Sequence, residues 1–345
     1  MLGQSIGPVI GGIITEYFGF HAIFWFLFLL GSCALFLILL FLPETLRRIA
    51  GNGTTPLYGL DRPIVARSLE KRYWQQEKNS EISPAPKITL GSILSPLRFL
   101  FEKDVFVTLF FGAIVYTIWS MVTSSTTALF QPRFGLSNLQ VGLIFLPNGA
   151  GCVLGSYLMG KILDRDYAIV ETAYRKTHSL SLGDSIPLDR KRLADFPVSR
   201  ARLRSAVYLV SIFVAAVAGY GFSITSSVLL SHGKGTGLAI PLVLQFIIAF
   251  TATGVFTQNS ALVVDLYPGA SASATAVNNL VRCSVGAVGV AVVQFVVDAI
   301  GAGWTFLMFA LLAAACSPLL VLQWVYGERW RRERMERMVR KEGDV

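Results

Sequence analysis

Long apolar runs separated by polar, basic segments restrict this sequence to one class of fold. A helix needs about 20 mostly apolar residues to cross the hydrocarbon core of a bilayer. The composition, 53% hydrophobic and only 15% charged, matches that requirement. We therefore predict an all-α polytopic membrane protein with about eight transmembrane helices. The runs lie at 1–16, 22–42, 105–130, 139–162, 204–224, 238–264, 272–297 and 303–326, and the first is short because the chain starts inside it.

The positive charge is distributed as in a membrane protein. A net charge of +9 would by itself also suit a nucleic-acid-binding protein. However, the basic residues are concentrated at 43–104, at 161–204 and after Gly327, between or beyond apolar runs. This alternation follows the positive-inside rule and places both chain ends and both long loops in the cytoplasm. We expect a protein of the plasma membrane, or else of the vacuole or another endomembrane, that binds no nucleic acid.

No residue pattern indicates an enzyme, a metal site or a cofactor site. The three histidines are isolated, and the four cysteines all fall inside apolar runs. Neither a disulfide framework nor a metal-ligand spacing is therefore present. The glycine-rich stretch Gly233–Gly237 lacks the spacing of a phosphate-binding loop. The sequence predicts a membrane protein that is not an enzyme and uses neither a cofactor nor a metal.

Arg282 is the only formally charged side chain deep within an apolar run. A charge at that depth is costly and normally faces a partner or a water-filled cavity. Asn278 lies one helical turn earlier on the same face, and Asn279 lies beside it. We expect these three residues to face a central pathway. In the alternative, Arg282 reaches the interface or binds a backbone carbonyl and only holds the helices together.

Two further polar faces are weaker candidates for the pathway. Tyr116 and Trp119 share one helical face with the hydroxyl of Thr123. Gln258 lies seven residues before Asp265 on one side of another run. Contact with a substrate is one interpretation of Tyr116, Trp119 and Gln258. Hydrogen-bonded packing between helices is the other.

Small residues recur at helical spacing in two runs. Gly3, Gly7 and Gly11 form a ridge at the start of the chain, and Gly151 and Gly155 repeat the spacing further on. Such stripes let another helix approach closely within a membrane. We therefore predict a helix contact at each stripe.

The chain after Gly327 is charged and has helical periodicity. Glutamate precedes arginine by four residues at three places, and such pairs are neighbours on a helix surface. We predict a solvated helix with ordinary surface ion pairs. The pairs are Glu328/Arg332, Glu333/Arg337 and Glu336/Arg340.

Several motifs resemble those of the major facilitator superfamily, in particular its fungal drug:proton antiporters of the quinidine-resistance and dityrosine-exporter group. The stretch Gly3–Gly12 resembles the glycine-proline motif of their fifth span. Gly160 with Asp164-Arg165 resembles the second copy of their loop motif, between spans eight and nine. The stretch Asp265–Arg282 is similar to their tenth-to-eleventh span region.

The resemblance implies that the chain corresponds to spans five to twelve of a twelve-span fold, truncated at its N-terminus. Residues 1–42 would be the last two spans of the first half, and 43–104 the cytoplasmic central loop. Residues 105–326 would form the six-span second half, and 327–345 a basic cytoplasmic tail. The residues that carry the conformational motifs would be Gly3, Gly7, Pro8, Gly11, Gly12, Gly160, Asp164 and Arg165.

The family also implies a function. Its members work by alternating access, in which two halves rock about a midplane site. The expected activity is proton-coupled export of drugs or amphipathic organic metabolites by a monomer, with a small-molecule substrate, protons and the bilayer as partners. Because nothing here matches the first four spans, a second expectation is a non-transporting membrane remnant or a partner-binding fragment.

Overall fold

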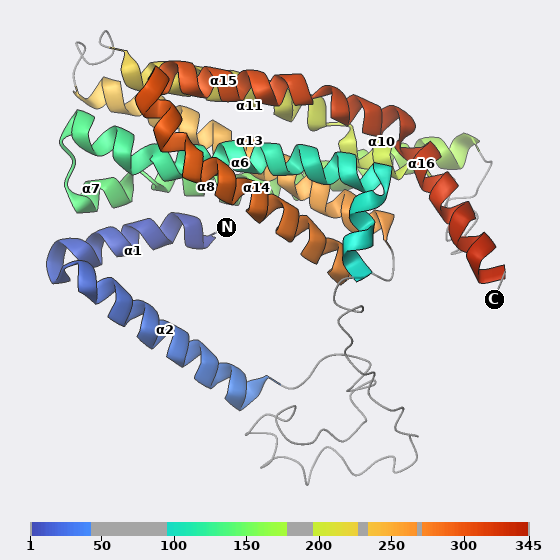
Figure 1. Ribbon diagram of the computed structural model, residues 1–345, viewed down its shortest axis with the longest axis horizontal. Helices are drawn as coiled ribbons and strands as arrows, with labels where there is room; N and C mark the ends of the chain where they lie inside the picture. The colour runs from blue at the N-terminus through green and yellow to red at the C-terminus, as the bar shows by residue number, and fades with distance from the viewer. Residues whose placement is uncertain (1, 43–94, 178–195, 227–233, 268–270, 344–345) are drawn as a thin grey trace. The chain divides into compact units, whose positions relative to one another are not determined.

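The computed structural model describes residues 2–42, 95–177, 196–226, 234–267 and 271–343, and every structural statement below concerns these residues. Their regular secondary structure is entirely helical (Figure 1), as the apolar runs predict. The chain divides into two compact units, Ile14–Ile93 and Met1–Ile13 with Leu94–Val345. Most of the predicted loop 43–104 lies outside the described residues.

The smaller unit contains the end of helix α1 (Leu2–Phe18) and helix α2 (Phe20–Phe41). Gly19 separates them with a φ of 79°, a backbone conformation that glycine adopts without steric cost. None of the 22 residues of α2 is buried, and they are almost all apolar. Such a helix is suited to contact lipid on much of its surface.

The larger unit is a bundle of long helices. With α2, the described residues include seven helical segments long and apolar enough to cross a membrane. The predicted run 1–16 instead forms the shorter α1, and a short 3-10 helix, η2 (Ser95–Phe101), precedes the bundle. The bundle helices are α6 (Lys103–Phe134), α7 (Asn138–Leu143), α8 (Leu146–Thr177), α10 (Val198–Leu203), α11 (Ala206–Thr225), α13 (Lys234–Leu266), α14 (Ser271–Ile300), α15 (Ala302–Cys316) and α16 (Pro318–Gly343).

Helix α13 lies at the centre of this bundle. It packs against α6, α8, α11 and α14, while α14 also packs along α6 and α15 along α11. The contact between α8 and α13 confirms the prediction from Gly151 and Gly155. A Cβ atom at Gly151 would meet the carbonyl oxygen of Phe246, and one at Gly155 would lie 2.7 Å from that of Phe250. The two helices therefore touch backbone to backbone.

The predicted helix contact at the first glycine stripe, Gly3, Gly7 and Gly11, lies on a neighbouring face of helix α1 instead. A Cβ atom at Gly3, Gly7 or Gly11 would meet no atom within 4 Å, so no helix approaches the ridge closely at these three positions. The neighbouring face packs instead. A Cβ atom at Gly142 of α7 would lie 2.7 Å from the carbonyl oxygen of Pro8, and one at Gly12 would lie 2.8 Å from that of Asn138. The prediction of a close helix contact at Gly3, Gly7 and Gly11 is thus wrong, because the close contacts are made at Pro8 and Gly12 instead.

Helix α8 extends well beyond the apolar run 139–162 that predicted it. Helix α8 continues to Thr177 through a stretch that we expected to begin the loop 163–203. Gly160, Asp164 and Arg165 therefore lie within a helix, and the side chains of Asp164 and Arg165 are exposed. Hydropathy marks only the part of a helix that faces lipid, so it does not detect a helix that continues into water.

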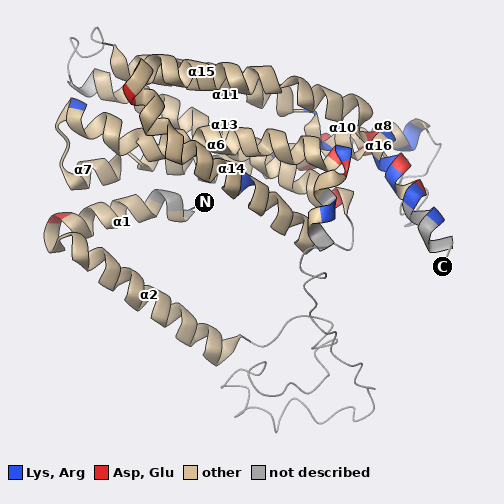
Figure 2. Ribbon diagram, viewed as in Figure 1, with Lys and Arg blue, Asp and Glu red and all other residues tan. Residues whose placement is uncertain are grey.

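The end of α16 is not the solvated surface helix that the sequence suggested. The Arg334 side chain is only 3% exposed and forms an ion pair at 2.5 Å with the buried carboxylate of Asp104, at the start of α6. It also donates at 3.1 Å each to the Tyr267 hydroxyl and the Leu266 carbonyl. Arg334 therefore joins α16, α6 and the end of α13 at the charged end of the bundle (Figure 2).

Neighbouring residues reinforce this junction. Burial raises the pKa of the Tyr267 hydroxyl to about 12, and this hydroxyl accepts a hydrogen bond from Arg334 at 3.1 Å. Arg337, expected to pair with Glu333, instead reaches Glu102 at 2.8 Å. The pattern of Glu-to-Arg pairs was misleading because it did not distinguish the solvent face of α16 from the face that packs on the bundle.

Candidate functional site

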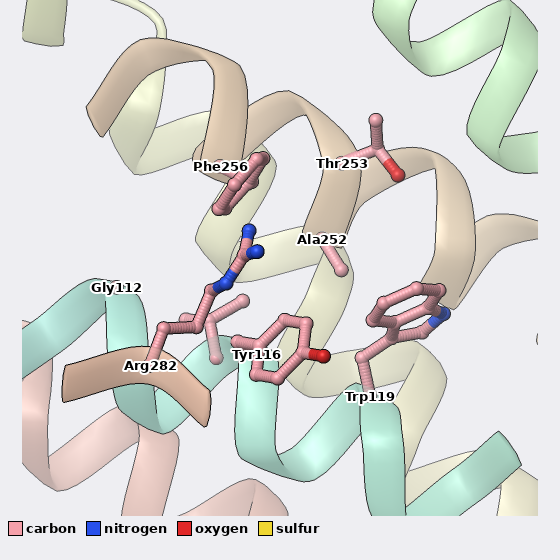
Figure 3. Close-up of a pocket in the computed structure, with 8 residues that line it drawn as sticks. Gly112, Tyr116, Trp119, Ala252, Thr253, Phe256 and Arg282 are labelled. Carbon is pink, nitrogen blue, oxygen red and sulfur yellow. The ribbon is translucent and has the colours of Figure 1, made fainter. Parts of the chain in front are cut away.

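A cavity of about 240 Å³ lies between three helices of the bundle (Figure 3). Helix α6 provides four neighbouring positions of one face, α13 provides three, and α14 provides one arginine. The wall is mostly apolar and aromatic, with a few polar groups, as is usual for small-molecule sites. The lining residues are Gly112, Val115, Tyr116, Trp119, Ala252, Thr253, Phe256 and Arg282.

Two glycines bring Arg282 to this cavity. Gly286 and Gly289 follow it at about one-turn spacing along α14, and both are buried against α6. A Cβ atom at Gly286 would lie 2.9 Å from a ring carbon of Tyr116, and one at Gly289 would lie 2.6 Å from the Met121 side chain. Because α14 can approach α6 this closely, Arg282 is held beside the Tyr116 ring.

The Arg282 guanidinium lies between two aromatic rings, as Figure 3 shows. Its central carbon is 4.5 Å from the Tyr116 ring centroid and 3.9 Å from that of Phe256. Both distances suit cation–π attraction, which stabilises the charge without using its hydrogen-bond donors. The Nε atom is buried and has no hydrogen-bond partner in the described part of the chain. Arg282 is thus oriented by ring contacts, and its Nε donor is not used by any residue that the structure describes.

Trp119 is fixed on the wall of the cavity. Its indole Nε1 donates to the side-chain oxygen of Asn148 on α8 at 2.9 Å, and Asn148 is fully buried. The Tyr116 ring packs edge-on against the indole with centroids 5.7 Å apart. The Thr123 hydroxyl donates to the Trp119 carbonyl of its own helix. Tyr116 and Trp119 therefore line the cavity, whereas the Thr123 hydroxyl is used in a hydrogen bond to the backbone of its own helix.

The other candidates from the sequence do not line the cavity. Gln258 is completely buried, and its side-chain nitrogen donates at 2.7 Å to the Ser205 hydroxyl, away from the lining residues. Asn278 is buried on α14, and Asn279 is exposed. The structure therefore brings together three of the predicted pathway residues, Arg282, Tyr116 and Trp119.

Sequence reasoning missed Phe256 and Asn148 as parts of this site. Phe256 is one of 24 phenylalanines. Nothing in the sequence around an aromatic residue of an apolar run indicates which side chain it contacts in the fold. Asn148 did carry a signal, because a polar amide in an apolar run needs a hydrogen-bond partner. Its pairing with Trp119 depends on how α8 packs against α6, which periodicity does not determine.

The site contains one full charge. Arg282 is the only charged side chain among the eight described residues that line the cavity. A guanidinium offers a planar fork of donors that matches a carboxylate or phosphate. The aromatic walls lower the local dielectric and so strengthen its attraction for an anion. The arrangement is suited to bind the anionic group of a small organic molecule.

The close approach of α14 to α6 can be tested with one methyl group. We expect Gly289→Ala to lower the free energy of unfolding by about 1–3 kcal/mol, because the methyl overlaps the side chains of Thr117 and Met121. Thermal unfolding of the purified chain in detergent measures this change. Gly160→Ala is the matched control, since its methyl meets no atom within 4 Å. Equal stability of the two variants would contradict the packing that positions Arg282.

Comparisons with known proteins agree on one family. Residues 1–183 match the family model described as Major Facilitator Superfamily. Over 341 residues the chain is 48% identical to citrate exporter 1 of Aspergillus niger, an alignment that covers 99% of this chain and 63% of the exporter. No solved structure matches the chain.

More distant relatives are also transporters by name. The chain is 30% identical over 340 residues to MFS-type transporter phiD of Fungal sp., covering 98% of this chain and 49% of that protein. It is 28% identical over 313 residues to MFS antiporter QDR2 of Candida albicans, covering 90% and 58% respectively. The chain thus spans less than two thirds of the length of each of these relatives.

Proposed function

Because the chain belongs to the major facilitator superfamily, we propose that it forms part of an exporter for a small organic anion, with citrate or a related carboxylic acid as the substrate. The observation that carries this proposal is the Arg282 guanidinium, held between two rings at a cavity with its Nε donor unused. The relative that is 48% identical over 341 residues is named a citrate exporter, which supports the same substrate class.

Recognition would rest on charge-assisted hydrogen bonds. A hydrogen bond to a charged group contributes about 1.5–3 kcal/mol, and a guanidinium can make two parallel bonds to one carboxylate. Trp119 and Tyr116 would enclose the uncharged part of the substrate. The cavity of about 240 Å³ lies below the range of about 300–1,000 Å³ common for drug-sized ligands. A cavity of this size is compatible with a small carboxylic acid.

The membrane potential would supply the driving force. A cell interior that is electrically negative repels an anion outward with about 2.3 kcal/mol per charge per 100 mV. A multiply charged acid would gain this amount for each net charge that crosses. Among the eight residues that line the described cavity there is no carboxylate or histidine to carry a proton. In this proposal the membrane potential, and not proton exchange at this cavity, drives export of the anion.

Alternating access would connect the cavity to each side of the membrane in turn. In this proposal the contact of Pro8 and Gly12 with helix α7 is a moving contact, because Gly12 and Gly142 carry no side chain that would lock the two helices together. Gly3, Gly7 and Gly11 would face other partners during the cycle. Gly160, Asp164 and Arg165 would act at the cytoplasmic side, where the two charged side chains are exposed. The working unit would be a monomer in the plasma membrane, with a vacuolar or other endomembrane as the alternative.

Proton-coupled export of drugs or amphipathic metabolites is the second candidate function. The relative QDR2, 28% identical over 313 residues, is named an antiporter, and the Gly3–Gly12 stretch resembles an antiporter motif. The aromatic walls would also accept an amphipathic ring system. A non-transporting remnant is not favoured, because the similarity to proteins named as transporters extends over 90–99% of this chain.

Acid export and drug export can be distinguished by the compounds that cells release. We expect cells that express the chain to accumulate citrate, or a related di- or tricarboxylic acid, in the medium faster than cells carrying an empty vector. Chromatography of the medium measures the acids, and growth on a panel of amphipathic drugs measures drug export. Increased drug resistance without acid secretion would overturn the proposal in favour of the second candidate.

A further inference from the structure

A second cavity, of about 430 Å³, opens at the charged end of the bundle. It lies between the end of α8, the short helix α10 and the middle of α16, whose labels lie together in Figure 2. Two arginines, Arg200 and Arg204, form one part of its wall. Ile169, Val170, Ala173 and Trp324 form an apolar part. None of these residues belongs to the site that contains Arg282.

The cavity lies at the level of the membrane interface. Arg204 is the first residue of the predicted span 204–224, and Trp324 is near the end of the predicted span 303–326. The charge distribution places both of these span ends on the cytoplasmic side. Apolar side chains next to them are exposed, with Val321 53% and Val325 46% accessible. Tryptophan at such a level is typical of the headgroup region.

The two arginines give the cavity a positive character. Arg200 lies 3.4 Å from Glu328, which offsets part of its charge, and its guanidinium is 5.5 Å from the Trp324 ring centroid. Arg204 is exposed and forms no ion pair with a carboxylate in the described part of the chain. One guanidinium is thus oriented on an aromatic ring, and the other forms no ion pair with the carboxylates that the structure describes.

We propose that this cavity binds an anionic phospholipid of the cytoplasmic leaflet. The phosphate would lie between Arg200 and Arg204, and the first part of an acyl chain would lie along Ile169, Val170 and Trp324. A water-soluble phosphate would use the arginines but leave the apolar wall empty, so both features together specify a lipid. Basic pockets between membrane helices on the cytoplasmic side commonly bind such headgroups. The bound lipid would join α8, α10 and α16.

Native mass spectrometry of the purified full chain tests this proposal. The chain in detergent is mixed with equal amounts of phosphatidylserine and phosphatidylcholine that carry the same acyl chains. We expect at least about fivefold more bound phosphatidylserine than phosphatidylcholine, because each basic residue near a headgroup contributes about 1 kcal/mol, or about fivefold. The double variant Arg200→Gln/Arg204→Gln should bring this ratio to about one.

A matched control distinguishes lipid binding at this cavity from attraction to positive charge elsewhere on the protein. Arg329 of α16 is exposed and pairs with Glu333 outside the cavity, so Arg329→Gln should keep the wild-type ratio. Thermal unfolding without added lipid shows whether the double variant is still folded, and Arg204→Gln alone should give a ratio between those of the wild type and the double variant. A wild-type ratio near one, or an unchanged ratio in the double variant, would overturn the proposal. Equal displacement of the lipid by soluble glycerophosphoserine would also overturn it.

Discussion

Arg282→Met is expected to reduce the rate of organic-acid export roughly ten- to a hundredfold. Methionine keeps the length and apolar contacts of the side chain, but it removes the charge and every donor. The loss of charge-assisted hydrogen bonds to a carboxylate costs about 1.5–3 kcal/mol, which corresponds to this range. The initial rate of export, measured over a range of internal citrate concentrations, checks the prediction.

Two further variants make the Arg282 test specific. Arg282→Lys keeps the charge without the planar fork, so we expect an intermediate rate. Arg329→Gln removes an exposed charge from α16 and should leave the rate unchanged. If Arg282 only held the helices together, Arg282→Met would lower the unfolding temperature, and its surviving folded protein would export normally. That result would contradict the role of Arg282 in binding.

Arg334→Met is expected to lower the free energy of unfolding by about 3–5 kcal/mol. The change leaves the Asp104 carboxylate buried without its partner, which is the costly way to break an ion pair. The double variant Asp104→Leu/Arg334→Met removes both charges and should recover most of the loss, because a buried pair costs nearly as much desolvation as it returns. Chemical unfolding of the purified chain in detergent, analysed as a double-mutant cycle, measures both effects.

The neighbouring exposed pair provides the control for this cycle. Arg337 contacts Glu102 from a side chain that is 63% exposed, so Arg337→Met should cost at most about 1 kcal/mol. A similar loss in the Arg334 and Arg337 variants would contradict the buried junction. It would restore the solvated tail that the sequence suggested.

The fold was predictable wherever lipid dictates composition. The apolar runs located each long helix, because a bilayer requires a continuous apolar segment of limited length. The continuation of α8 to Thr177 and the docking of α16 were not predictable in this way. Both occur beyond the lipid, where polar residues are allowed and only tertiary contacts distinguish a buried arginine from a solvated one. Arg334 therefore looked like any other charge in the tail.

The candidate site was predictable in part, through the cost of burying charge. Arg282 was identifiable because a charge within a span needs a compensating environment. Phe256, which contacts it, gave no such signal. Gln258 has the helical spacing of a pathway residue, yet it binds Ser205, because periodicity identifies a face but not the helix that covers it.

The most direct test of the proposed function is citrate efflux from proteoliposomes that contain the purified chain, with equal pH on both sides. We predict that an interior-negative potential, set by a potassium gradient and valinomycin, accelerates efflux of radiolabelled citrate. Each 60 mV should contribute about 1.4 kcal/mol per net charge moved. Arg282→Met should abolish the acceleration. Efflux that ignores the potential and requires an inward proton gradient would contradict potential-driven anion export and favour proton antiport.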